Sequence, residues 1–267
     1  MFTYNTMQIF IGVLGMEPLE MVSPPSDDQR RIQEFPQKLV EYLNSMIQSQ
    51  ITPRDIVNRD SIRNAIIVAM AVGGSTNVML HAPEIARSAG YSDFANQIMS
   101  PEEFNYLSEY VVPVLIDARP FGTYSMVDID EHGGVQVIVK ELLEAGLLNG
   151  ETLTCTGETL AGQVARLDPP IPDGTVIYTV KDPYKQTGGL RVLGGNLSSE
   201  NSAVLKLAGV EGGLEGNVFI GKARTFNSEA SLLNSLETEP EIFNDRDMII
   251  VRYEGPSGAP GMPEMLD

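Results

Sequence analysis

The chain has 267 residues, of which 42% are hydrophobic and 20% are charged. That apolar content supports one large folded core or two smaller ones, and it excludes an intrinsically disordered chain. The formal net charge of −18 at pH 7, without clusters of Lys or Arg, excludes nucleic acid and other polyanions as partners.

The first half of the chain predicts helices separated by short loops. Apolar residues recur there at helical spacing, between helix-start residues such as Ser26 and glycines that end the segments. Pro36 lies inside the longest segment and predicts a kink. A short buried strand is expected over 111–116. The expected helices cover 5–16, 26–50, 60–72, 78–88 and 134–145, and another begins at the capping box Ser100-Pro101-Glu102-Glu103.

The residue composition and the expected secondary structure change near Arg166, which predicts a boundary between two domains. Residues 167–174 are rich in proline, and the runs that follow are short, apolar and separated by Gly-rich turns. We therefore expect an α/β fold with a helix-rich N-terminal domain over 1–166 and a β-barrel-like C-terminal domain over 175–267. The expected strands are 176–180, 190–193, 203–207, 218–220 and 248–253, the last of them buried, with one short helix after Ser228.

Membrane and redox signals in the sequence indicate a reducing compartment. No apolar stretch reaches membrane-spanning length, and Met1-Phe2-Thr3-Tyr4 lacks the basic flank of a signal peptide. The single cysteine, Cys155, cannot form an internal disulfide. We expect the cytoplasm, or an organelle matrix after import, and no membrane partner.

Gly73-Gly74-Ser75-Thr76-Asn77 is the motif that points most directly to ligand binding. Two glycines followed by hydroxyl and amide residues at a helix start present backbone N–H groups and the positive end of the helix, which together can hold a carboxylate. An ordinary helix break capped by Ser75 or Thr76 explains the same residues equally well. Gly188-Gly189 and Gly194-Gly195-Asn196 raise the same question, and hairpin glycines are the favoured interpretation there.

The other residues that could carry chemistry favour structural roles. His81 and His132 lack a ligand-like spacing. Cys155 is expected to be a small buried hydrophobe rather than a catalytic thiol. Four acidic residues could gather around a metal, although a solvated acidic face is the favoured interpretation. They are Asp117, Asp128, Asp130 and Glu131.

The end of the chain holds a segment typical of a binding loop. Three glycines and three prolines are interleaved over 255–263, so the backbone there is both bent and stiff. A simple turn does not need such a loop, whereas a carboxylate held beside a ligand or metal does. Glu264 is therefore the candidate metal ligand.

Six motifs occur in a characteristic order along the chain. They are Asn5-Thr6-Met7, Ile51-Thr52-Pro53-Arg54-Asp55-Ile56, Gly73-Gly74-Ser75-Thr76-Asn77, Gly188-Gly189-Leu190, Gly194-Gly195-Asn196-Leu197, and Arg252-Tyr253-Glu254-Gly255-Pro256 continued by Pro260-Gly261-Met262-Pro263-Glu264-Met265-Leu266. Each motif alone is weak, but the ordered set resembles the dihydroxy-acid dehydratase and phosphogluconate dehydratase family. The resemblance runs nearly from end to end.

The resemblance implies a hydro-lyase that converts a 2,3-dihydroxy carboxylate into a 2-keto acid, in the biosynthesis of isoleucine and valine. It implies an iron–sulfur cluster held by three cysteines, and Mg²⁺ held by acidic residues and a modified lysine. It assigns Glu264 to Mg²⁺, whereas the residues expected to bind the substrate follow from their types at the helix start and are Gly74, Ser75, Thr76 and Asn77. The expected partners are a small dihydroxy acid and, in the full-length form, a second copy in a homodimer.

The chain departs from the family pattern in its catalytic groups. Cys155 is in the wrong place for a cluster ligand, and the three cluster cysteines, the acidic ligand and the modified lysine are expected upstream of Met1. The serine that acts as base is expected downstream of Asp267, so no catalytic residue is assigned within the chain. We therefore expect an internal fragment, lacking both ends, that is inactive by itself. A sugar-acid (aldonate) dehydratase, with Phe121 near the site that sets substrate size, and a non-catalytic binding module derived from the enzyme both stay open.

Overall fold

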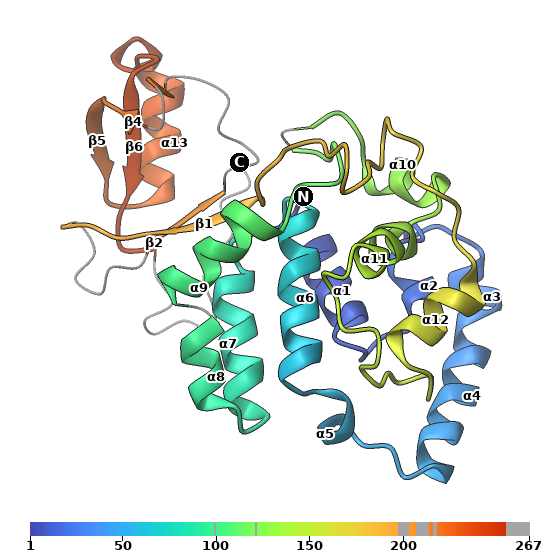
Figure 1. Ribbon diagram of the computed structural model, residues 1–267. Coiled ribbons are helices and arrows are strands. Elements are labelled where there is room, and N and C mark those ends of the chain that lie inside the picture. Colours follow the sequence, from blue (N-terminus) through green and yellow to red (C-terminus); the bar gives the residue numbers. More distant parts are fainter. Residues whose placement is uncertain (99, 121, 197–202, 207–213, 216–217, 255–267) are drawn as a thin grey trace. The chain divides into compact units, whose positions relative to one another are not determined.

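The computed structural model describes the chain except for residues 99, 121, 197–202, 207–213, 216–217 and 255–267. The chain divides into two compact units, Met1–Gly209 and Val210–Asp267. Helices dominate the first unit, and in the second a helix joins two parallel strands (Figure 1).

The described helices of the first unit are mostly short and connected by tight loops. Among the described residues, no helix is long and apolar enough to cross a membrane. The helices are α1 (Thr3–Val13), α2 (Leu19–Val22), α3 (Arg30–Gln33), α4 (Phe35–Gln48), α5 (Pro53–Ile56), α6 (Arg59–Ala71), α7 (Val78–Ser88), α8 (Ser92–Ile98), α9 (Pro101–Tyr106), the π-helix η1 (Leu107–Val111), α10 (Met126–Glu131), α11 (Val135–Glu144) and α12 (Leu160–Leu167).

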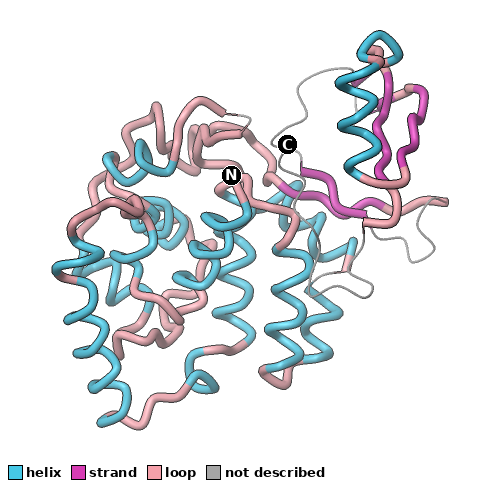
Figure 2. The backbone as a smooth tube through the Cα atoms, turned by 180° about the vertical axis from the view of Figure 1, so that it is seen from behind, coloured by secondary structure: helices cyan, strands magenta, loops and turns pink. Residues whose placement is uncertain are grey.

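The helix α6 is the centre of the first unit. Asn58 starts it, because its side-chain oxygen accepts hydrogen bonds from the N–H groups of Asp60 and Ser61, both at 3.0 Å. Every residue from Ala65 to Ala71 is apolar and buried, and a helix that is apolar on all sides belongs inside a core. The helices α1, α7 and α11 pack against it (Figures 1 and 2).

Segments that are distant in sequence donate hydrogen bonds to the last carbonyls of α6. A helix leaves its last four carbonyls without partners inside the helix. The carbonyl of Ala71 accepts a hydrogen bond from the N–H of Leu115 at 2.8 Å. The carbonyl of Met70 accepts one from the N–H of Gly189 at 3.2 Å. Chain segments far from α6 in sequence are thereby fixed at its end.

The helix-rich character predicted for the first part of the chain is confirmed, with a correction to the segment 26–50. The segment 26–50 is not a single kinked helix, because α3 ends at Gln33 and α4 begins at Phe35. Pro36 lies in the first turn of α4. A proline is accepted there because its missing N–H needs no partner in the first turn, so Pro36 helps to start a helix instead of bending one.

The predicted strand over 111–116 is wrong. Val111 is the last residue of η1, and Val114 and Ile116 form only isolated β-bridges with later residues. The segment is buried, so its apolar run indicated burial correctly but not a strand ladder. The predicted strand over 176–180 is likewise reduced to an isolated bridge.

The described strands form three two-stranded sheets. Two of the sheets are antiparallel, and the third is parallel. The pairs are β1 (Leu190–Leu193) with β2 (Ala203–Lys206), β3 (Leu214–Glu215) with β4 (Val218–Phe219), and β5 (Lys222–Phe226) with β6 (Asp247–Val251).

A β–α–β arrangement forms the larger part of the second unit. The helix α13 (Glu229–Thr238), followed by the short 3₁₀ helix η3 (Pro240–Ile242), connects β5 to the parallel β6. Met248 and Ile249 on β6 are 48% and 44% exposed. The prediction of a buried final strand is therefore wrong, because only one described strand lies beside β6 and both of these side chains are about half exposed.

The β-barrel predicted for the C-terminal domain and the domain boundary predicted near Arg166 both stay predictions. The strands that the structure describes do not close into a barrel, so a barrel-like C-terminal domain is not confirmed. The proline-rich stretch 167–174 does follow the end of α12, but Val176 and Leu190 beyond it are buried in the core of the first unit. The first unit therefore extends to Gly209 and includes β1 and β2.

Candidate functional site

Three motifs that are distant in sequence meet at the end of α6. The turn 73–77 joins α6 to α7, and both the start of α1 at residues 1–6 and residues 188–189 lie against it. The Met1 nitrogen donates a hydrogen bond to the Gly73 carbonyl at 3.2 Å, which ties the first two segments together. We call residues 1–6, 73–77 and 188–189 the turn site.

Thr6 fixes the backbone of the turn site. Its side chain is fully buried, and its Oγ1 accepts a hydrogen bond from the Ser75 N–H at 3.1 Å. The same hydroxyl donates to the Phe2 carbonyl at 2.8 Å. Gly74 is needed beside it, because a Cβ at that position would lie 2.7 Å from Cγ2 of Thr6.

Thr3, Ser75 and Asn77 form a polar cluster at the N-terminal end of α1. Thr3 Oγ1 and Ser75 Oγ are 2.9 Å apart. The Asn77 Nδ2 donates to Thr3 Oγ1 at 3.0 Å, and the Asn77 N–H donates to Ser75 Oγ at 3.2 Å. Ser75 and Asn77 are buried, so their polar groups serve first to hold the turn in shape.

Within the turn 73–77, Thr76 is the residue whose donors have no partner among the described residues. The N–H groups of Ser75 and Asn77 are engaged as described, and those of Gly73 and Gly74 donate to carbonyls of α6. Within the described part of the chain, neither the N–H nor the hydroxyl of Thr76 has a hydrogen-bond partner, and Thr76 is partly exposed at the start of α7. The prediction of carboxylate binding by residues 74–77 therefore depends chiefly on Thr76.

Gly188 and Gly189 are packing glycines, and the hairpin interpretation is wrong for them. Both precede β1. A Cβ on Gly189 would lie 2.5 Å from the Gly73 Cα, and one on Gly188 would lie 2.8 Å from Ser108 Oγ. Two backbones approach closely here, which only glycine permits. Gly195, by contrast, is exposed and has open space around it.

We expect Thr6→Val to lower the free energy of unfolding by about 1–3 kcal/mol, because it leaves the buried Ser75 N–H without an acceptor while it keeps the side-chain volume. Urea unfolding measures the loss, and hydrogen exchange measures the Ser75 amide directly. Thr6→Ser is the matched control, because it keeps the hydroxyl and removes only a methyl group. Equal stability of the two variants would show that the hydroxyl does not hold the turn.

Cys155 behaves as predicted for a small buried residue. It is 8% exposed, and its N–H donates to the Gly15 carbonyl at 2.7 Å. Burial raises the pKa of the Cys155 thiol to about 11, so the thiol is protonated at neutral pH. An iron–sulfur cluster needs several cysteine ligands, and Cys155 is the single cysteine of the chain, so the chain alone does not fit as the holder of a cluster.

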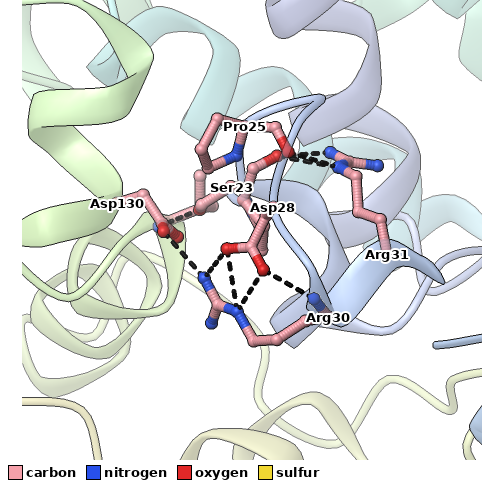
Figure 3. Close-up of polar contacts among 8 residues, drawn as sticks. Ser23, Pro25, Asp28, Arg30, Arg31 and Asp130 are labelled. Carbon is pink, nitrogen blue, oxygen red and sulfur yellow. Dashed lines mark hydrogen bonds and ion pairs between the residues drawn. The ribbon is translucent and has the colours of Figure 1, made fainter. Parts of the chain in front are cut away.

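Asp128 and Asp130, two of the acidic residues of α10, are engaged in a helix cap and an ion pair. Arg30 lies between Asp28 and Asp130, with its Nη2 at 2.6 Å and 3.0 Å from their carboxylate oxygens (Figure 3). The bonds from Arg30 lower the pKa of the Asp28 carboxyl. Asp128 accepts hydrogen bonds from the N–H and hydroxyl of Ser125 at 2.6 Å, which caps α10.

The residues that the structure describes do not fit either implied metal group. Among them, no three His, Cys, Asp or Glu side chains gather where they could hold a metal ion. Glu264, the candidate Mg²⁺ ligand, lies outside the described residues, as does Phe121. No step of a reaction is therefore assigned to metal bound by the described part of this chain.

Sequence reasoning missed three residues of this region. Thr3 and Thr6 bind the turn 73–77, and Lys206 on β2 donates from Nζ to the Met1 carbonyl at 2.7 Å. Burial lowers the pKa of the Lys206 ammonium. Thr6 lies in the motif Asn5-Thr6-Met7, which contributes to the family resemblance but does not indicate what Thr6 does. Nothing in the sequence around Lys206 indicated its contact with Met1.

Two family models match consecutive parts of the chain. The N-terminal model of dihydroxy-acid/6-phosphogluconate dehydratase matches residues 1–163, and the C-terminal model of the same family matches residues 175–267. The turn site thus lies in a region where the chain follows the family pattern. The chain belongs to the dihydroxy-acid/6-phosphogluconate dehydratase family.

Individual relatives carry the name dihydroxy-acid dehydratase. The chain is 45% identical to that of Leifsonia xyli subsp. xyli, 44% identical to that of Acidothermus cellulolyticus and 41% identical to that of Mycobacterium leprae. Each comparison extends over 266 residues and covers 100% of this chain, but only 44%, 45% and 44% of the respective relative. The chain therefore spans less than half the length of these relatives.

Proposed function

We propose that this chain contributes to a hydro-lyase of the dihydroxy-acid dehydratase type, which converts a branched 2,3-dihydroxy carboxylate into a 2-keto acid. The observation that carries the proposal is the turn site, where three of the family-like motifs converge beside the available donors of Thr76. Identities of 41–45% to relatives with this name support the same activity.

The proposed reaction removes one molecule of water from the substrate. The proton on C2 and the hydroxyl on C3 leave, an enol forms between C2 and C3, and the enol tautomerises to the 2-keto acid. The substrate carboxylate must be held so that the C2 proton faces a base, since orientation supplies much of the rate. We assign this holding role to the turn site.

Thr76 is the proposed contact to the carboxylate. Its N–H and hydroxyl can both donate to one anion at the start of α7, where the helix end carries partial positive charge. Ser75 and Asn77 act through their bonds to Thr3, which keep the turn in place. Gly74 permits the close packing of this turn against Thr6.

The remaining parts of the proposal depend on the family resemblance. We propose an iron–sulfur cluster and Mg²⁺ as the cofactors of the complete enzyme, with Glu264 as a Mg²⁺ ligand. The single cysteine supports the cytoplasm or an organelle matrix as location. A homodimer is proposed for the full-length form.

A chimera tests the activity. In the Leifsonia xyli relative, the matching segment is replaced with the 266 aligned residues of this chain. We expect the chimera to release a 2-keto acid from a branched 2,3-dihydroxy carboxylate, because the transplanted segment supplies the holding site. A folded chimera with its cofactors bound that leaves this substrate unchanged would refute the proposal.

Within that chimera, Thr76→Val is expected to raise KM about tenfold or more, because a hydrogen bond to a charged group contributes about 1.5–3 kcal/mol. Thr76→Ser keeps the hydroxyl and should leave KM nearly unchanged. Melting temperature should be the same in both variants, because Thr76 has no side-chain partner among the described residues. If Thr76→Val leaves KM unchanged, Thr76 does not bind the substrate carboxylate. The proposed activity still stands in that case.

A further inference from the structure

The π-helix η1 is a single turn that continues α9. Its closing hydrogen bond runs from the Val112 N–H to the Leu107 carbonyl at 2.8 Å. In an α-helix the same N–H would donate to the carbonyl of Ser108, four residues back. Turns of this kind are rare and occur mostly at functional sites, so a role beyond helix formation is expected for η1.

The π-turn leaves the Ser108 carbonyl to a segment that is distant in sequence. That carbonyl accepts a hydrogen bond from the Gly188 N–H at 2.6 Å. The Ser108 side chain is buried, and its hydroxyl donates to the carbonyl of Leu190. Ser108 therefore holds both ends of the segment 188–190, with its main chain at one end and its side chain at the other.

Asn105 extends this attachment along β1. Its Nδ2 donates to the Val192 carbonyl, and its Oδ1 accepts from the Val192 N–H, both at 2.8 Å. A neighbouring antiparallel strand exchanges the same two bonds with the residue opposite it. Asn105 and Ser108 are three residues apart and face the same side of the helix, and between their contacts Glu109 forms an ion pair with Arg191. Side chains of α9 and η1 thus serve as a strand along one edge of β1, while β2 pairs with the other edge.

This attachment fixes where the glycines before β1 lie. The Gly189 N–H donates to the Met70 carbonyl at 3.2 Å, and a Cβ on Gly189 would lie 2.5 Å from the Gly73 Cα. Gly73 begins the turn that carries Thr76. If the segment 188–190 withdrew from η1, the backbone packed against Gly73 would be lost, and the turn would gain freedom to change shape.

We propose that Ser108 is a positioning residue for substrate binding. It holds residues 188–189 against Gly73, and it thereby keeps the turn 73–77 in the shape that presents the donors of Thr76. Ser108 is only 1% exposed, so it acts through these neighbours and not by touching the substrate. This inference rests on the proposed function and deepens it, because it adds a residue that controls the same carboxylate contact.

Ser108→Ala in the chimera tests the proposal, with Ser61→Ala as the matched control. Ser61 is fully buried at the start of α6, and its hydroxyl donates to the Ile56 carbonyl at 3.0 Å. Each variant removes one buried hydroxyl that donates to the main chain, so both chimeras should melt below the unchanged one. We expect Ser108→Ala to raise KM about threefold or more, the effect of weakening one hydrogen bond to the substrate. Ser61→Ala should leave KM unchanged, because Ser61 lies at the other end of α6.

A double variant distinguishes positioning from a general loss of stability. If Ser108 acts through Thr76, Ser108→Ala should raise KM by a smaller factor when Thr76→Val is already present. A KM that Ser108→Ala leaves unchanged while Thr76→Val raises it would overturn the proposal and leave the proposed function standing. An equal rise of KM in Ser61→Ala would also overturn it.

Hydrogen exchange gives a test that does not require activity. In the chain itself, the amides of Gly188 and Gly189 should exchange faster in Ser108→Ala than in the wild type, and at the wild-type rate in Ser61→Ala. Unchanged exchange of both amides in Ser108→Ala would show that Ser108 does not hold this segment, and the proposal would fall. If the unchanged chimera does not convert the substrate, the proposed function fails, and these exchange rates still decide whether Ser108 holds residues 188–189 in place.

Discussion

Replacing Phe10 with alanine is expected to lower the free energy of unfolding by about 3–5 kcal/mol, the cost typical of removing a buried phenylalanine. Phe10 is fully buried on α1, and α1 packs against α6, the central helix of its unit. The loss combines apolar area returned to water with a cavity that the surrounding helices cannot fill completely. Chemical unfolding followed by circular dichroism measures it.

The matched control for Phe10→Ala is Tyr4→Ala on the same helix. Tyr4 is 72% exposed, so its removal should change the free energy of unfolding by less than about 0.5 kcal/mol. Phe10→Ala should also increase hydrogen exchange at Ser75, since α1 carries the Thr6 acceptor of that amide. Similar stabilities of the two variants would show that α1 is not held by its inner face.

Gly189→Ala is expected to destabilise the chain by about 3 kcal/mol, at the upper end of overpacking costs, which corresponds to a fall in melting temperature of roughly 6–12 °C. The added Cβ would lie 2.5 Å from the Gly73 Cα, and both contacting groups are backbone. No side-chain rotation can relieve that contact. The segment before β1 would have to move away from the end of α6.

Gly195→Ala is the control for Gly189→Ala. It also places a methyl group beside β1, but nothing lies within 4 Å of it. Its melting temperature should match that of the wild-type chain. If Gly189→Ala also melts at the wild-type temperature, the backbones of Gly189 and Gly73 are not held in contact. The turn site then does not include 188–189.

The sequence predicted those elements whose causes are local. The helix over 60–72 could be recognised because its apolar residues end at Gly73-Gly74, where the structure also ends α6. The strand over 111–116 could not be predicted correctly, because its extended backbone bonds to Ala71 and Lys185 instead of to a neighbouring strand. An apolar run reports burial, while the choice between a strand and an irregular segment depends on distant partners.

The candidate site shows the same limit. Residues 74–77 could be selected from their types and their place between two helices. Their partners Thr3 and Thr6 could not, since hydrogen bonds between residues some seventy positions apart leave no pattern in one sequence. Glu264 remains a sequence-based prediction, because it lies outside the described residues.

The end of α6 has a kinetic consequence. Its last carbonyls accept hydrogen bonds from the N–H groups of Leu115 and Gly189. These residues reach α6 only after long stretches of chain have closed into loops. Loop closure costs entropy before the new contacts repay it, and contacts of large sequence separation slow folding. The body of α6 can form early from its own residues, whereas its final turn must wait for the rest of the unit. The region that shapes the turn site is thus expected to be the last part of the first unit to become ordered.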